Sequence, residues 1–421
     1  MVLRIPSPPV GDLHGVVAGS LALTRRAIGA IESDALDAEK VVGEALLLLR
    51  ATRSVLADRE WQDLYAATAP LARPHTLGAS LCRDPARAPE LAFAHVMLAD
   101  LGDPEPGLDL LLDLALADEA TGPTPYVVAA LQRRWLIDVR GGARRLRADG
   151  LVHRSSLARP VDLLRCSTQD VYDLTHAVMH GTDLGAWPLA APRPERHLAA
   201  DLDALLGIAL DADNLDLTTE LLWAWPMLGL RWTPVARLAL DVVLRTFREH
   251  GYLPGPGHDP AGPGADGEVL KTSYHATLVL GILAAALLRT DPLPEHSGPD
   301  VVTGAGSALL AELEDGARPW LVAAGRRHDL DRLAPTLLAV ALRRASDRAD
   351  LADVRRLLEL AVRLGLADGR AVVQATGLVR RCTALARYVA SSGLAHHQVH
   401  RDHLSAVAHE QLDRQVVDAR R

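Results

Sequence analysis

The stretch ATLVLGILAAALL, residues 276–288, is the longest apolar run in the chain. Its 13 residues are too few to span a bilayer, which takes about 20, so we interpret it as a buried core helix. Around it, apolar residues recur at three- and four-residue spacing almost everywhere, and alternating runs of β-branched residues are nearly absent. That spacing is typical of amphipathic helices. The sequence therefore predicts an all-α protein.

The predicted helices are of about 15 residues, with short connections and no exact repeat. This organisation favours an α/α toroid or a stacked helical-hairpin solenoid. We expect a toroid-like domain over 1–295 and, over 296–421, a C-terminal helical segment that packs on or closes it. Predicted helices include 106–117, 157–166, 168–181, 214–229 and 272–289. The Gly- and Pro-rich segment 251–271 is either a disordered crossover or a lid over a site.

Composition excludes several classes of function. The 421 residues are 49% hydrophobic, enough for a large core, and the net charge of −8 gives no basic footprint for nucleic acid. The three cysteines lie far apart without a CxxC pair, which fits a reduced cytoplasm and neither a disulfide framework nor a thiolate zinc site. The first residues lack the apolar core of a signal peptide. We expect a cytoplasmic protein that binds neither membrane nor nucleic acid. A homodimer is possible on this sequence.

The first candidate site is YDLTHAVMHGTDLG, residues 172–185. Ser167 or Thr168 can cap this helix, and the spacing places Tyr172, His176 and His180 on one face. Two imidazoles at i and i+4 have the reach to bind one metal ion. The alternative is that both are packed or surface histidines.

The second candidate is DADNLDLTTELLWAW, residues 211–225, in which Asn214 is a reasonable N-cap. Asp216 and Glu220 are four residues apart and can face the same way. Glu220 has apolar neighbours, and a buried carboxylate needs a partner. It is therefore a candidate metal ligand or a general base with a raised pKa. The alternative is that the aspartates cap a helix and Glu220 pairs with an arginine.

The third candidate is KTSYHATLVLG, residues 271–281. If Thr272 or Ser273 caps the apolar helix, Tyr274 and His275 lie in its first turn. The positive end of the helix dipole would then favour the neutral imidazole that a metal ligand or general base requires. The alternative is that both side chains cover the end of a core helix.

These stretches resemble an actinobacterial all-helical family of unknown function that occurs in natural-product gene clusters. The resemblance covers about residues 50–290 and rests on four patterns: Tyr172-x-x-Thr175-His176, Thr182-Asp183-x-Gly185, Asp216-Leu217-x-x-Glu220-Leu221 and Tyr274-His275-x-Thr277. It names no reaction. It implies that the residues belonging together are His176, Asp183, Glu220 and His275, and it leaves His180 outside.

The leading hypothesis is an enzyme of specialised metabolism with a central pocket for a small molecule or peptide. His176, Glu220 and His275, with His180 as a further candidate ligand, would hold one divalent ion, zinc or iron, or transfer protons. Asp183 would orient an imidazole, and Tyr274 completes the catalytic candidates. The sequence contains no Gly-rich phosphate loop, so it gives no sign of a nucleotide cofactor.

Two other classes of function are weighed against the enzyme. A helical scaffold could bind a peptide or a carrier protein, and would be favoured if His176, Glu220 and His275 lay far apart. A terpenoid-cyclase-like enzyme is suggested faintly by DADN at 211–214, whose fourth residue breaks the acid motif, while only 4% of residues are aromatic. The histidine-rich tract 393–410 would bind metal opportunistically or form a solvated helix.

Overall fold

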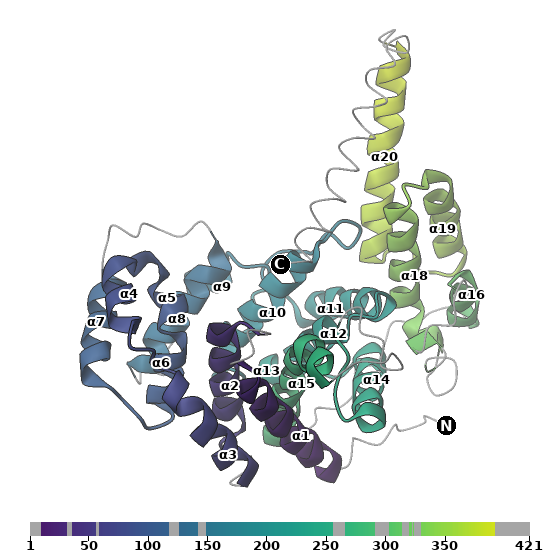
Figure 1. Ribbon diagram of the computed structural model, residues 1–421. Coiled ribbons are helices and arrows are strands. Elements are labelled where there is room, and N and C mark those ends of the chain that lie inside the picture. The colour runs from purple at the N-terminus through teal and green to yellow at the C-terminus, as the bar shows by residue number, and fades with distance from the viewer. Residues whose placement is uncertain are drawn as a thin grey trace.

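The computed structural model describes residues 10–31, 36–55, 59–117, 126–141, 149–255, 266–290, 303–313, 320–321, 323 and 330–391. Over these ranges the regular structure is helical and no strand occurs, which confirms the all-α prediction (Figure 1). The helices are α1 (Val10–Gly29), α2 (Ala38–Thr52), α3 (Arg59–Thr68), α4 (Leu77–Arg83), α5 (Ala88–Leu91), α6 (Phe93–Asp100), α7 (Pro106–Ala117), α8 (Val127–Arg140), α9 (Asp149–Val152), α10 (Thr168–Thr182), α11 (Glu195–Asp211), α12 (Leu215–Leu222), α13 (Ala224–Leu228), α14 (Pro234–His250), α15 (Asp266–Arg289), α16 (Ala305–Glu312), α18 (Leu330–Asp347), α19 (Leu351–Arg363) and α20 (Arg370–Ser391).

Helix α15 is the centre of the packing. It contacts α1, α2, α12 and α13, and nearly every residue from Ala276 to Ala286 is buried, which confirms the predicted core helix. Val269–Arg289 is long and apolar enough to cross a membrane, but most of it is buried inside the protein, as in a core helix. With α15 enclosed by other helices, the arrangement does not confirm a toroid or a solenoid.

The remaining helices flank this centre (Figure 1). Helices α4 to α8 form a group on one side, joined to the centre where α6 packs on α2 and α8 packs on α10. On the other side α18 packs on α11, α14 and α16, and α20 projects away from the body. The C-terminal helices thus pack on the first part, while the division into two domains at residue 295 stays a prediction.

Three helix boundaries differ from those predicted. Residues 157–166 form turns, because Pro160 has no backbone N–H for an intrahelical hydrogen bond and the Asp162 side chain accepts from the backbone N–H of Leu164 at 3.2 Å. The predicted helix 214–229 is divided at Trp223 into α12 and α13. The predicted helix 272–289 begins earlier, at Asp266.

We predict opposite effects of two glycine substitutions. A Cβ on Gly281 would lie 2.6 Å from Ser20 Cβ, where α15 meets α1, so Gly281→Ala should lower the free energy of unfolding by about 1–3 kcal/mol. Gly15 lies on α1 with nothing within 4 Å of an added Cβ. Gly15→Ala should raise the free energy of unfolding by about 0.5–1 kcal/mol, because alanine restricts the unfolded chain. Urea denaturation measures both, and equal effects would contradict this account of the α1–α15 contact.

The Asp203 carboxyl predicts a pH dependence of stability. Burial raises its pKa from 3.8 to about 7, despite a hydrogen bond from the hydroxyl of Thr233, the residue that caps α14. The folded state therefore binds this proton more tightly than the unfolded state, and this group's contribution to stability falls as pH rises from about 4 to about 7. Asp203→Asn should gain stability relative to the wild type between pH 5 and pH 8. A constant difference in melting temperature across that range would contradict the assignment.

Candidate metal centre

The local sequence fixes the two helices that carry most of the site. Ser167 begins α10 with a capping box: its hydroxyl accepts from Asp170 N–H at 3.2 Å, and Asp170 accepts from Ser167 N–H at 2.8 Å. Asn214 begins α12 by accepting from Leu217 N–H at 2.9 Å. Both predicted caps are confirmed. On α12 the four-residue spacing then places Asp216 and Glu220 on one face, turned toward α15.

The centre of the site is the imidazole of His275 on α15. Its Nε2 lies 3.6 Å from Asp216 Oδ1 and 3.9 Å from Glu220 Oε1, and one ligand atom from each of these three residues lies within 4.8 Å of the others. Its Nδ1 lies 3.0 Å from Oε1 of Glu44 on α2. One ring nitrogen thus faces an orienting carboxylate while the other faces two more carboxylates. Histidines that bind metals commonly show this arrangement.

The two carboxylates of α12 are held from behind by α10. Tyr172 donates its hydroxyl to Asp216 Oδ2 at 2.8 Å, and Thr175 donates to Glu220 Oε2 at 2.5 Å. Each carboxylate therefore has one oxygen fixed by a hydroxyl and the other turned to His275. Within the described residues, the buried Asp216 Oδ1 has no hydrogen-bond donor. A buried acceptor without a donor is costly unless something else occupies the space it faces.

The electrostatics of the cluster follow from its burial and its close charges. Burial and the neighbouring Asp216 raise the pKa of Glu220 to about 8, although His275 opposes the shift. Burial disfavours the charged form of His275, but Asp216 and Glu44 raise its pKa to about 10. The expectation that His275 lies in the first turn of its helix, where the dipole would favour the neutral ring, is wrong. His275 lies in the third turn of α15, beyond the reach of the helix terminus.

His176 lies at the exposed edge of the site. Its side chain is 39% exposed, and its Nε2 is 3.9 Å from Glu220 Oε2. Burial lowers its pKa, as does the charge on His275. The structure thus brings together His176, Glu220 and His275, with His176 outside the three groups that approach one another most closely.

His180, the other half of the predicted histidine pair, lies away from the carboxylates. It is buried, with its ring 5.1 Å from that of Trp135 and 5.9 Å from that of His176. Burial holds its pKa well below the usual value. Its place in the predicted ligand set is therefore not supported by position, because no carboxylate of the described residues contacts it.

Asp183 has a different partner from the imidazole that we expected. Its carboxylate accepts two hydrogen bonds from Arg50, at 2.6 and 2.9 Å, and one from Trp135 Nε1 at 2.7 Å. It ends α10 in the left-handed region, with φ of 49°. The orienting role predicted for Asp183 is wrong: this side chain ties α10 to α2 and α8.

Tyr274 supports the site through Glu44. Burial together with the neighbouring Glu44 carboxylate raises the pKa of its phenol. Lys40 lies 3.8 Å from Glu44 on the same helix. These contacts and His275 hold the pKa of Glu44 below its usual value despite burial, which acts in the opposite direction.

Sequence reasoning missed Glu44 and gave Asp216 no role of its own. The available signal for Glu44 was its position as the one charged residue in VVGEALLLL, residues 41–49. Asp211, the first residue of DADN, is held by Arg344 at 2.5 and 2.8 Å and is not free to act as a cyclase acid. Of the predicted lid, 256–265 lie outside the described residues and 266–271 belong to α15. The tract 393–410 also lies outside the described residues.

A family model described as "Domain of unknown function (DUF6895)" matches residues 18–286, more than half of the chain. The chain belongs to this family. The match contains α2, α10, α12 and nearly all of α15, the helices that carry the cluster around His275, and the resemblance to a family of unknown function is confirmed at that level. No curated protein and no solved structure matches the chain.

The contacts of Asp183 predict a structural role for it. Arg50 and Asp183 have side chains only 10% and 4% exposed, and removing one charge of a buried pair costs about 3 kcal/mol. Asp183→Asn keeps the left-handed backbone and an acceptor for Trp135 but loses the charge. It should lower the free energy of unfolding by that amount, as measured by chemical denaturation. A variant of unchanged stability would contradict the assignment.

Proposed function

We propose that this DUF6895 protein is a metal-dependent enzyme whose single divalent ion is held by Asp216, Glu220 and His275. One observation carries the proposal: two carboxylate oxygens and one imidazole nitrogen from two helices face the same small space. Each α12 carboxylate is already fixed by a hydroxyl at its other oxygen. Preorganised ligands of this kind are typical of built metal sites.

Charge supports a cation at this position. Three carboxylates, those of Glu44, Asp216 and Glu220, lie close to two cationic groups, His275 and Lys40. A metal-bound imidazole is neutral, so in that state the three ionised carboxylates and Lys40 leave two negative charges in excess, which a divalent ion would balance. A mixed oxygen and imidazole ligand set suits a first-row divalent ion, and we favour zinc or iron.

Three protein ligands leave coordination positions open, as in catalytic rather than structural sites. A bound ion would polarise a substrate oxygen or activate a water molecule. His176, whose side chain is 39% exposed and whose Nε2 is 3.9 Å from Glu220, would exchange protons with a substrate at the open edge. We propose a small-molecule or peptide substrate and a role in bacterial specialised metabolism, the latter on the resemblance to an actinobacterial family.

The distances around Glu220 favour the metal-dependent enzyme over a non-catalytic binding protein. The binding-protein hypothesis would become the leading one if His176, Glu220 and His275 lay far apart, but both histidines lie 3.9 Å from Glu220. A metal-free version of the enzyme keeps His176 and Glu220 as an acid–base pair at the same distance. The experiment below separates that version from the metal-dependent one.

Metal content is the decisive measurement. Untagged protein purified without chelator should contain about one zinc or iron per chain by elemental mass spectrometry. His275→Gln and Asp216→Asn should lose the ion. His176→Gln, which changes a neighbouring imidazole outside the ligand set, should retain it. Circular dichroism establishes that each variant is folded.

Two controls sharpen the result. A chain ending at Ala395 lacks most of the histidine tract and should keep the ion, whereas loss of metal only in that chain would assign the ion to the tract. In the cobalt-substituted protein, azide should change the visible absorption spectrum if a coordination position is open. Wild-type protein without metal, unable to take up zinc, iron or cobalt, would sink the ligand assignment and leave the acid–base version.

A further inference from the structure

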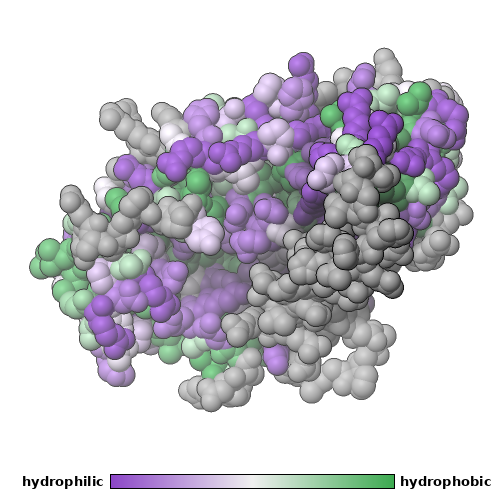
Figure 2. Space-filling model, turned by 90° about the horizontal axis from the view of Figure 1, so that it is seen from above, coloured by the Kyte–Doolittle hydropathy of each residue, from purple (hydrophilic) through white to green (hydrophobic). Residues whose placement is uncertain are grey.

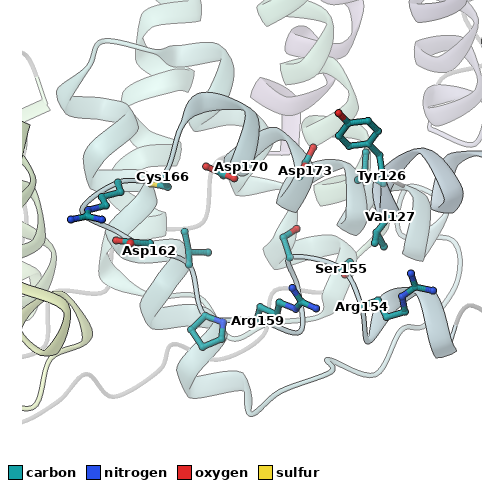
Figure 3. Close-up of a pocket in the computed structure, with 14 residues that line it drawn as sticks. Tyr126, Val127, Arg154, Ser155, Arg159, Asp162, Cys166, Asp170 and Asp173 are labelled. Atoms are coloured by element: carbon teal, nitrogen blue, oxygen red, sulfur yellow. The ribbon is translucent and has the colours of Figure 1, made fainter. Parts of the chain in front are cut away.

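A pocket of about 560 Å³ lies on the other side of α10 from the metal centre. It is lined by the start of α8, the turns between α9 and α10, and the first turns of α10 (Figure 3). Figure 3 shows Arg154 and Arg159 across the pocket from Asp173, with Tyr126 and Val127 at one end. Its volume is that of a site for a small organic molecule.

The charged groups of the pocket differ in how far they are already engaged. Asp170 accepts from Ser167, Asp173 accepts from Gln169 Nε2 at 2.9 Å, and Asp162 accepts from a backbone N–H. In contrast, the guanidinium groups of the lining arginines make no hydrogen bond or ion pair with any described residue; these are Arg154, Arg159 and Arg165. The pocket therefore offers unused donors to a ligand, while each of its carboxylates already accepts a hydrogen bond.

Two further features suit an organic anion. The hydroxyl oxygen of Ser156 is buried at the pocket and has no hydrogen-bond partner among the described residues. Tyr126, 72% exposed, and the neighbouring Val127 provide an aromatic and apolar surface beside Arg154. A ligand with an acidic group and an apolar or planar body would use both the donors and this surface.

We propose that this pocket binds a small organic phosphate or carboxylate, with Arg154 and Arg159 as the anion-binding residues. The planar guanidinium presents paired N–H donors that match the oxygens of either acidic group. Ser156 adds one donor, and Tyr126 with Val127 covers the body of the ligand. This site is separate from the metal centre, because α10 turns Asp170 and Asp173 to the pocket and Tyr172 and Thr175 to the cluster.

Isothermal titration calorimetry with phenyl phosphate, benzoate and benzyl alcohol tests the proposal. Phenyl phosphate or benzoate should bind and the neutral benzyl alcohol should not, and the tighter of the two anions identifies the acidic group. Arg154→Gln/Arg159→Gln should weaken binding at least about tenfold, since each charged hydrogen bond lost costs about that factor. Arg83→Gln changes another exposed arginine, outside the pocket, and should bind as the wild type does.

The two sites can be judged independently. Asp216→Asn, expected to lose the metal ion, should still bind the anion, so binding that disappears in this variant would place the anion at the metal centre and overturn the pocket assignment. Equal binding by the wild type and the double arginine variant would overturn it too, as would no binding of either anion. Both arginines are exposed, and circular dichroism of the double variant verifies that it is folded.

Discussion

The contact of His275 with carboxylates from two other helices is the constraint on which the rest of this structure depends. Glu44 on α2 and Asp216 on α12 approach opposite nitrogens of the ring, at 3.0 and 3.6 Å. The contacts require α15 to lie between α2 and α12, which places a long apolar helix in the middle of the protein. The burial of that helix supplies the hydrophobic free energy that holds charged groups in a place they would otherwise avoid.

The same position explains why the rear of the site is built from hydroxyl groups. A carboxylate turned toward His275 leaves one oxygen facing α10, and that oxygen would be costly without a donor. Tyr172 and Thr175 provide the donors without adding charge. A lysine or arginine in either place would neutralise the carboxylate and remove the excess negative charge that favours a cation. Neutral donors behind the carboxylates therefore leave their negative charge to be balanced by a cation on the side that faces His275.

The fold class and the helix starts could be predicted from sequence because they depend on local chemistry. Ser167 and Asn214 cap their own helices through side chains three residues from the N–H groups they accept from, so their signals are contained in a short window. The start of α15 was missed because Thr272 and Ser273 resemble a cap. In the structure the Thr277 hydroxyl donates to the backbone carbonyl of Ser273 at 2.8 Å. Thr272 and Ser273 therefore belong to the interior of α15 and do not cap it.

The functional side chains were predictable only in part, for the same physical reason. Glu220 and His275 stood out as polar residues in apolar helices, and the structure brings them together. Asp183 also stood out, but its partner is Arg50, 133 positions away, and no local pattern distinguishes an aspartate that binds an arginine from one that orients a histidine. Glu44 belongs to the site only because α2 packs on α15, a contact that the sequence of α2 does not contain.

Helix α10 lies between the two proposed sites, and its helical period accounts for the residues that it gives to each. At about 100° per residue, Tyr172, Thr175 and His176 occupy one side of the helix, while Asp170 and Asp173 occupy another. The hydroxyls that fix Asp216 and Glu220 are therefore on the same rigid helix as the aspartates that line the pocket. Asp183 ties the end of this helix to Arg50 on α2, the helix that also carries Glu44. The buried ion pair thus fixes α10 relative to α2, and with it the separation between the hydroxyls behind the proposed metal site and the carboxylate that faces His275.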